Sequence, residues 1–173
     1  MGKELKNVKA VCLGLMAATL LLVTPDAYAG AGVGDRAPEF VAVKTMTGRR
    51  MKLKKFRKKI VVLTFGASWC KPCKKELPAI SKLAKKFPRV KFIAINIDKN
   101  KAKGKKFIRK YVRSRKVRTG LDPNGSTVQL YEPPAMPSTY IIGKYGIIRH
   151  RHRGYRSGDE NSLAKKLRKM LSK

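Results

Sequence analysis

The sequence predicts a single α/β domain, and three observations support this fold class. The chain has 173 residues, a length that suits one ordinary domain. Its hydrophobic content of 43% excludes a wholly disordered basic protein, because such chains lack the apolar side chains that offset the entropy lost on ordering. Short β-branched runs alternate with segments of helical periodicity, and no internal repeat or long linker divides the chain.

Residues 1–29 have the pattern of a secretory leader, or signal peptide. Three lysines precede an apolar stretch over residues 10–23, and Ala27, Tyr28 and Ala29 form a small-x-small site that a signal peptidase accepts. The apolar stretch is shorter than the roughly 20 residues that span a bilayer, although an uncleaved membrane anchor is the alternative. Cleavage after Ala29 would leave residues 30–173 as the folded domain in an exported, oxidising compartment such as the periplasm, where disulfide chemistry is permitted.

The first half of the predicted domain contains a hairpin, two central strands and a helix. Residues 39–43 and 51–53 are interpreted as the strands of an amino-terminal β-hairpin. Residues 60–65 form a short β-branched apolar run, the pattern of a strand buried on both faces. Apolar positions recur at helical spacing over residues 74–87, and residues 90–97 have the pattern of a second central strand.

The second half is predicted to contain two further helices and a hairpin. Residues 107–112 have one apolar helical face on an otherwise basic segment. Residues 138–142 and 147–150 have the pattern of two strands joined by a glycine-containing turn. Ser157 and Glu160 have the spacing of a capping box, which predicts the start of a carboxy-terminal helix.

The most informative motif is Trp69-Cys70-Lys71-Pro72-Cys73, placed where the first central strand ends and a helix begins. Two cysteines at this spacing in a first helical turn can bring their sulfurs within bonding distance. The first lies at the positive end of the helix, where free backbone N–H groups stabilise a thiolate. We therefore expect Cys70 to be an exposed nucleophile, and Cys73 to resolve the mixed disulfide that Cys70 forms.

A zinc site or a static disulfide is the alternative interpretation of the cysteine pair. Zinc prefers four ligands, and the sequence offers no second cysteine pair to complete such a site, only His150 and His152. These histidines are two apart on a predicted strand, so they could form a weak surface metal site, but such a pair more often faces solvent. The succession of strand, CxxC and helix favours redox chemistry over both alternatives.

Two segments resemble the TlpA/ResA-like thioredoxin family of exported thiol–disulfide oxidoreductases. The first is FGASWCKPCKKELP, residues 65–78, which is similar to the active-site segment of that family. The second is LDPNGSTVQLYEPPAMPSTYIIGKYGII, residues 121–148, which resembles the later block with its cis-proline loop. The similarity covers nearly all of residues 35–171. It implies a thioredoxin fold, a central mixed β-sheet flanked by helices with an amino-terminal β-hairpin extension.

The resemblance implies roles for residues around the cysteines. Pro137 matches the cis-proline that lies beside the reactive sulfur and helps to hold the substrate backbone, and an X–Pro bond adopts the cis form at little cost. Trp69 and Met136 are expected to contact the partner polypeptide. A core methionine that fills a gap is the alternative for Met136. Pro78 matches a helix-kinking proline.

Glu76 matches a glutamate that the TlpA/ResA-like proteins carry three residues after the second cysteine. Thioredoxin itself has a buried aspartate in the preceding strand, where this chain has Thr64. A carboxylate near the buried thiol could accept its proton when Cys73 attacks. The alternative is a glutamate on the helix surface, paired with a neighbouring lysine, of which Lys71, Lys74 and Lys75 are nearest in sequence.

The positive charge of the chain is unusually large and clustered. The formal net charge is +32, and residues 44–59 and 99–118 hold nine and eleven Lys or Arg without an acid. Few aromatic residues interleave with these runs, and an exported protein seldom meets nucleic acid, so nucleic acid is not an expected partner. Anionic lipid, lipopolysaccharide or a wall polymer fit the charge, as do acidic client proteins or an adaptation of the whole surface.

These observations predict dithiol–disulfide exchange with exported protein thiols and disulfides. No bound cofactor is required, because the electrons travel on Cys70 and Cys73. The resemblance implies a reductant that prepares apocytochrome c thiols for haem attachment and is renewed by a membrane electron donor. The rival function is a basic module that binds polyanions or membrane surfaces, with a purely structural disulfide. A peroxiredoxin is disfavoured, because its peroxidatic cysteine context is absent.

Overall fold

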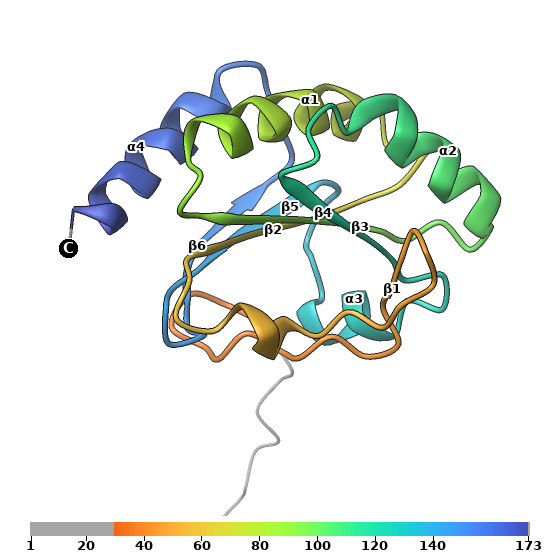
Figure 1. The fold of residues 1–173 in the computed structure, drawn as a ribbon, viewed down its shortest axis with the longest axis horizontal. Coiled ribbons are helices and arrows are strands. Elements are labelled where there is room, and N and C mark those ends of the chain that lie inside the picture. Colours follow the sequence, from red (N-terminus) through yellow and green to blue (C-terminus); the bar gives the residue numbers. More distant parts are fainter. Residues whose placement is uncertain (1–29, 173) are drawn as a thin grey trace, which may run out of the picture.

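The computed structural model describes residues 30–172, which form a six-stranded mixed sheet between two layers (Figure 1). The spatial strand order is β1-β4-β3-β2-β5-β6. The central strands β2, β3 and β4 are parallel, whereas β1, β5 and β6 join antiparallel to their neighbours. The strands are β1 (Lys44–Thr45), β2 (Val61–Gly66), β3 (Lys91–Asn96), β4 (Val117–Leu121), β5 (Ser138–Ile142) and β6 (Ile148–Arg153).

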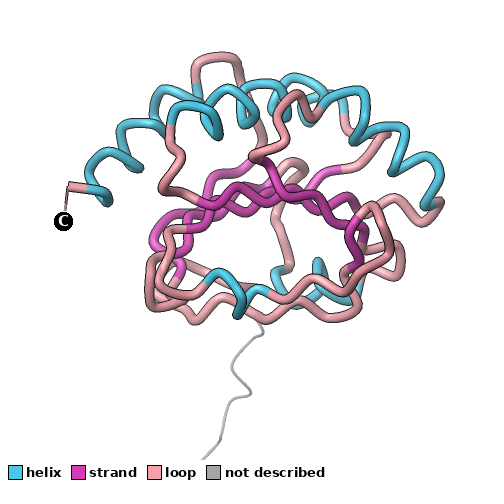
Figure 2. Tube along the Cα trace, viewed as in Figure 1, coloured by secondary structure: helices cyan, strands magenta, loops and turns pink. Residues whose placement is uncertain are grey.

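Three long helices cover one face of the sheet, and shorter elements cover the other (Figure 2). The long helices are α1 (Lys71–Lys86), α2 (Lys101–Tyr111) and α4 (Asp159–Leu171). On the opposite face lie the amino-terminal segment, the 3₁₀ helix η1 (Leu53–Phe56) and α3 (Ser126–Tyr131). The mixed sheet with flanking helices confirms the predicted fold class.

Strand β2 lies at the centre of the molecule, and all six of its residues are buried. Successive side chains of a strand point to opposite faces, so Val62 joins the apolar cluster under the long helices, while Val61, Leu63 and Phe65 join the cluster on the other face. Because β2 is flanked by β3 and β5, its carboxyl end is held rigidly where the helix with the cysteines begins.

Two elements escaped the sequence prediction. Strand β4 contains an arginine and a glycine, so it lacks the apolar pattern of a central strand. Gly120 is required there because a Cβ would lie 2.6 Å from Cγ1 of Val43, the residue just before the neighbouring strand β1. Helix α3 has only six residues, too few to show helical periodicity.

Two local expectations differ from the structure in detail. The amino-terminal hairpin is present, but its paired residues are 43–45 and 49–51: Lys44 bridges Arg50 antiparallel, Thr45 N–H donates to the Arg49 carbonyl at 2.7 Å, and Met51 N–H donates to the Val43 carbonyl at 2.9 Å. Strand β1 of this hairpin also pairs with β4. Leu53 begins η1 instead of ending a strand. The expected capping box also fails, because Gly158, not Ser157, is the N-cap of α4. One contact of the capping-box kind is present, because Gly158 N–H donates a hydrogen bond to the Glu160 carboxylate at 3.0 Å.

The expected leader, residues 1–29, lies outside the described residues. Within residues 30–172, no helix combines the length and the apolar character needed to cross a membrane. The two basic runs lie mainly on different sides of the sheet, since residues 99–118 include α2, whereas residues 44–59 include η1 (Figure 1).

Candidate active site

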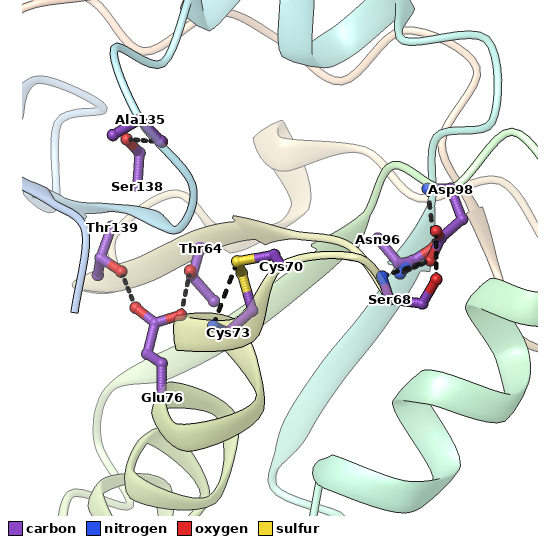
Figure 3. The surroundings of a disulfide bond; sticks show 10 residues. All are labelled: Thr64, Ser68, Cys70, Cys73, Glu76, Asn96, Asp98, Ala135, Ser138 and Thr139. Carbon is purple, nitrogen blue, oxygen red and sulfur yellow. Dashed lines mark hydrogen bonds between the residues drawn. A yellow bond between two sulfur atoms is a disulfide. The ribbon is translucent and has the colours of Figure 1, made fainter. Parts of the chain in front are cut away.

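Cys70 and Cys73 form a disulfide at the amino-terminal end of α1, with a Cα–Cα distance of 5.3 Å (Figure 3). Cys70 is the N-cap residue of the helix, and its Sγ accepts a hydrogen bond from Cys73 N–H at 3.2 Å. Pro72 occupies the first turn, where its missing N–H removes no intrahelical bond. The arrangement places Cys70 Sγ against the positive end of the helix dipole, as the motif predicts.

The two cysteines differ little in exposure, and both are buried in the disulfide form. Cys70 is 4% exposed and Cys73 is fully buried, so the expectation of an exposed Cys70 is wrong for this state. Cys73 packs against the end of β2, where a Cβ on Gly66 would lie 3.1 Å from its Sγ. Trp69, by contrast, is 64% exposed and forms part of the surface next to the disulfide. Cys70 is therefore the sulfur nearer to solvent.

A buried carboxylate fixes the loop that leads into the cysteines. Asp98 accepts hydrogen bonds from Ser68 N–H at 2.9 Å and from Ser68 Oγ at 2.8 Å. Asn96 Nδ2 donates to the same carboxylate at 2.7 Å. No sequence motif marks this network, although the two loops meet because they follow the carboxyl ends of the neighbouring parallel strands β2 and β3.

Glu76 is buried one turn beyond Cys73 on α1, with only 3% of its surface exposed. Thr64 Oγ1 of β2 donates to one of its carboxylate oxygens at 2.9 Å, and Thr139 Oγ1 of β5 donates to the other (Figure 3). The alternative of a surface glutamate paired with a lysine is therefore wrong. The residue that replaces the aspartate of thioredoxin, Thr64, holds this carboxylate in place.

Burial raises the pKa of Glu76 from its ordinary 4.5 to about 7. Desolvation disfavours the charged carboxylate, and this effect exceeds the opposing hydrogen bonds from Thr139 and Thr64. The negative charge of Asp159 raises the pKa further. A group that titrates near neutral pH can both take and release a proton there, which suits a general base.

The peptide bond between Met136 and Pro137 is cis, in agreement with the resemblance. The loop is held from two sides, because Gly154 N–H donates to the Pro137 carbonyl at 2.7 Å and Ser138 Oγ donates to the Ala135 carbonyl at 2.7 Å. Met136 is half-buried and packs against both apolar clusters of the domain. This packing agrees with a core contribution of Met136 and leaves part of the side chain accessible to a substrate.

The two histidines of β6 lie on the side of the strand that faces α4. His152 Nε2 is 2.9 Å from Asp159 Oδ2, so this pair is positioned as an ion pair when the imidazole is protonated. Burial and the nearby Lys166 and Lys169 lower the pKa of His150. Among the residues that the structure describes, no three His, Cys, Asp or Glu side chains are grouped so as to hold a metal ion.

Known proteins are similar to this chain in sequence and in fold. A family model described as the AhpC/TSA family matches residues 33–151. Thiol-disulfide oxidoreductase ResA of Bacillus thuringiensis subsp. konkukian is 33% identical over 118 residues, which cover 67% of this chain and 66%, just under two thirds, of that protein. Thioredoxin-like protein YneN of Bacillus subtilis is 32% identical over 124 residues, 70% of this chain and 71% of that one.

Solved structures agree with these relatives. A crystal structure from Chlorobium tepidum, assigned as a thiol:disulfide interchange protein DsbE, matches this structure with a TM-score of 0.76 and 29% sequence identity. The match covers 82% of this chain and 99% of the Chlorobium tepidum chain. StoA from Bacillus subtilis shares the fold, with a TM-score of 0.61 at 24% identity over 75% of this chain and 96% of StoA. The chain thus belongs to the AhpC/TSA family and, within the thioredoxin fold, to its TlpA/ResA-like members.

Proposed function

We propose that this protein is a thiol–disulfide oxidoreductase that exchanges the Cys70–Cys73 pair with cysteines of protein substrates. The observation that carries the proposal is a disulfide formed across the first turn of a helix, with Cys70 at the N-cap. On reduction, the free N–H groups of this turn stabilise a Cys70 thiolate, which attacks a substrate disulfide. Cys73 then attacks Cys70 Sγ and releases the reduced substrate.

Four further residues serve this exchange. Glu76 is the base that takes the proton from the Cys73 thiol before Cys73 attacks, which its position one turn away on the same helix face supports. Trp69, Met136 and Pro137 contact the substrate polypeptide. The exposed indole of Trp69 and the half-buried Met136, which packs against the cluster that contains both cysteines, support this role because they provide an apolar surface near the disulfide.

The direction of electron flow is that of a reductant acting outside the cytoplasm. Residues 1–29 direct export and are then removed, and residues 30–173 form the thioredoxin-like domain. A membrane electron donor restores the Cys70 and Cys73 thiols after each turnover. Apocytochrome c, whose haem-attachment sequence is Cys-x-x-Cys-His, is the proposed substrate. Measurement of the reduction potential against a dithiothreitol buffer tests the direction, since a reductant requires a potential well below that of its substrate disulfides.

Cysteine variants test the catalytic assignment. Cys70→Ser is expected to abolish reduction of an oxidised Cys-x-x-Cys-His peptide, because no thiolate remains to attack it. Cys73→Ser is expected to accumulate a mixed disulfide between Cys70 and the peptide, visible as an adduct in intact-protein mass spectrometry. Peptide reduction by Cys70→Ser at the wild-type rate would contradict the proposal.

Binding to anionic surfaces is a second proposed function, supported by the charge of the long helices. Exposed cations cover α1, α2 and α4, whereas Glu76 is buried and the other two acids, Asp159 and Glu160, are half-buried at one helix end. The exposed cations of this helical face are Lys71, Lys75, Lys82, Lys85, Lys86, Lys101, Lys103, Lys106, Arg109, Lys110, Lys165, Arg168 and Lys169. Sedimentation with phosphatidylglycerol vesicles should show binding that falls steeply between about 0.1 M and 1 M salt, where the screening length shortens from about 10 to about 3 Å.

A further inference from the structure

A cavity of about 30 Å³ lies between α1, β5, β6 and α4, and Glu76 forms part of its wall. Two or three water molecules fit in this volume, since one water needs about 10–15 Å³. The inner wall also includes Thr139, Ile80 and Ile141, all buried. The outer wall is formed by residues that are partly exposed, among them His152 and Asp159, whose side chains are 42% and 30% accessible. The cavity therefore extends from the buried carboxylate towards solvent.

The reaction creates a need for such a route, because Glu76 itself is almost inaccessible to bulk water. In the second step of exchange, the Cys73 thiol transfers its proton to the Glu76 carboxylate. The Cys73 thiolate forms a bond to Cys70 Sγ, the bond between Cys70 and the substrate sulfur breaks, and the substrate leaves as a thiolate. The proton on Glu76 must then leave before the carboxylate can act again.

Histidine is the residue type that suits this task at the cavity wall. The titratable and charged groups that face Glu76 across the cavity are His150, His152, Tyr155, Asp159, Glu160 and Lys166. Hydrogen bonds lower the pKa of Asp159 and of Glu160, so both stay ionised. Burial and the bond to Glu160 raise the pKa of Tyr155, so this phenol stays protonated.

The two histidines are not equivalent. Burial and two lysines lower the pKa of His150, so this imidazole resists protonation. His152 instead has Asp159 Oδ2 at 2.9 Å from its Nε2, a contact that orients the imidazole in the outer wall of the cavity. His152 is also more accessible to solvent than the carboxylate of Glu76, so it can pass the proton on.

We propose that this cavity is the route by which Glu76 exchanges its proton with solvent, and that His152, oriented by Asp159, receives the proton at the outer end. The proposal rests on the thiol–disulfide exchange proposed above. His152 touches neither sulfur in this scheme, so it is a positioning and relay residue and not a catalytic one. When the protein runs in the opposite direction, the same route returns the proton to Glu76.

Single-turnover kinetics separate the two steps of exchange. Fluorescence of Trp69, the sole tryptophan of the chain, reports the state of the neighbouring sulfurs when reduced protein is mixed with the uncharged bis(2-hydroxyethyl) disulfide. His152→Gln should leave the attack of Cys70 within about twofold of wild type. It should slow the second step about tenfold at pH 7 in dilute buffer. This loss is part of the roughly 10²–10⁴-fold rate increase that general acid–base catalysis contributes. Added imidazole should restore the rate. Arg149→Gln, an exposed change on the same strand, is the charge control.

Two further variants make the test specific to the route. In a Glu76→Gln background, His152→Gln should cause no additional loss, because there is no buried proton left to export. Ala79→Val, which narrows the cavity, should slow the second step in a way that imidazole does not restore. An unchanged second step in His152→Gln, or additive losses in the double variant, would overturn the proposal. Failure of Cys70 in the wild-type protein to attack the disulfide at all would instead overturn the proposed function.

Discussion

Two effects shift the pKa of the Glu76 carboxylate in opposite directions, and the larger of them determines the result. Removal from water favours the protonated form, while hydroxyl donors on both oxygens favour the ionised form. Burial has the greater effect, so the group titrates near pH 7 and not near 4.5. Because the carboxylate lies on the same face of α1 as Cys73, its protonation state is coupled to the chemistry of that sulfur.

The raised pKa of Glu76 predicts a loss of stability as pH rises. Between pH 4.5 and about 7 the unfolded chain has released the proton that the folded protein still holds, so the free energy of unfolding falls with increasing pH in this window and is level above it. The full change is about 3 kcal/mol, from 1.36 kcal/mol per pKa unit. Urea unfolding of the oxidised protein at pH 4.5 to 8 measures this slope.

Glu76→Gln is the matched control for this measurement. The amide keeps the size of the side chain but does not ionise, so the difference in unfolding free energy between the variant and wild type should shift in favour of the variant as pH rises. Parallel stability curves for the two proteins would show that Glu76 titrates at its ordinary pH despite its burial.

The two threonines provide a second prediction at this scale. Thr139→Val removes the hydrogen bond that lowers the pKa of Glu76 most, so the pKa should rise further. Thr64→Val should raise it less, because its bond has the smaller effect. The pH midpoint of the Cys73 step in single-turnover kinetics is the measurement. A midpoint unchanged in both variants would contradict the assignment of this proton to Glu76.

At the scale of elements, α1 and α2 are positioned by close contacts with the sheet. Cys73 of α1 packs against Gly66, and Gly104 of α2 packs against Asn96 of β3. Asn96 also holds Asp98, which in turn bonds to Ser68 in the loop before Cys70. The distance of α2 from the sheet is therefore linked, through three side chains, to the geometry of the active-site loop.

Gly104→Ala is predicted to destabilise the protein, contrary to helix propensity. Alanine in a helix interior is normally favoured over glycine by roughly 0.5–1 kcal/mol. Here the added Cβ would lie 2.2 Å from Asn96 Oδ1, so helix or side chain must move, at a cost of about 1–3 kcal/mol. Lys103→Ala, an exposed change in the same helix, should alter the unfolding free energy by less than about 0.5 kcal/mol. An increase in stability on Gly104→Ala would show that α2 moves freely.

Across the whole protein, the positive charge lies on both layers that flank the sheet, and the two basic runs have different neighbours. Without residues 1–29, which hold three lysines and two acids, the chain carries a net charge of +31. The run over residues 99–118 belongs to the layer of α1, α2 and α4, whereas the run over residues 44–59 lies against the opposite face. The cations of α1 also border the disulfide, so the helical face and the active site adjoin.

This arrangement predicts oriented binding to anionic vesicles. Replacing Lys101, Lys103, Lys106 and Lys110 by Gln should weaken binding more than the same change at Lys52, Lys54, Lys55 and Lys58, because only the first group lies in the same layer as the cations of α1 and α4. Both variants should reduce bis(2-hydroxyethyl) disulfide at the wild-type rate. Equal losses of vesicle binding from the two groups would indicate diffuse attraction without an oriented surface.

The amino-acid sequence was sufficient to predict the features that depend on short segments. Strand β2, helix α1 and the hairpin of β5 and β6 follow from apolar periodicity, and the CxxC pair follows from a local motif. The cis Met136–Pro137 bond is implied by the resemblance of residues 121–148 to the TlpA/ResA-like family. These features can be predicted because the residues that specify each of them lie close together in the sequence. Strand β4 could not be predicted in this way, because its place in the sheet depends on its two neighbours, β3 and β1.

The environment of Glu76 depends on contacts between distant parts of the chain. From sequence, a buried base and a surface glutamate paired with lysine were equally compatible with its position. The structure places Thr139, 63 residues away, on one oxygen, and joins β6 to α4 through His152 and Asp159 beside the same cavity. Burial sets the pKa of this carboxylate, and the side chains around it come from four separate elements. No local sequence pattern shows which of these elements will meet.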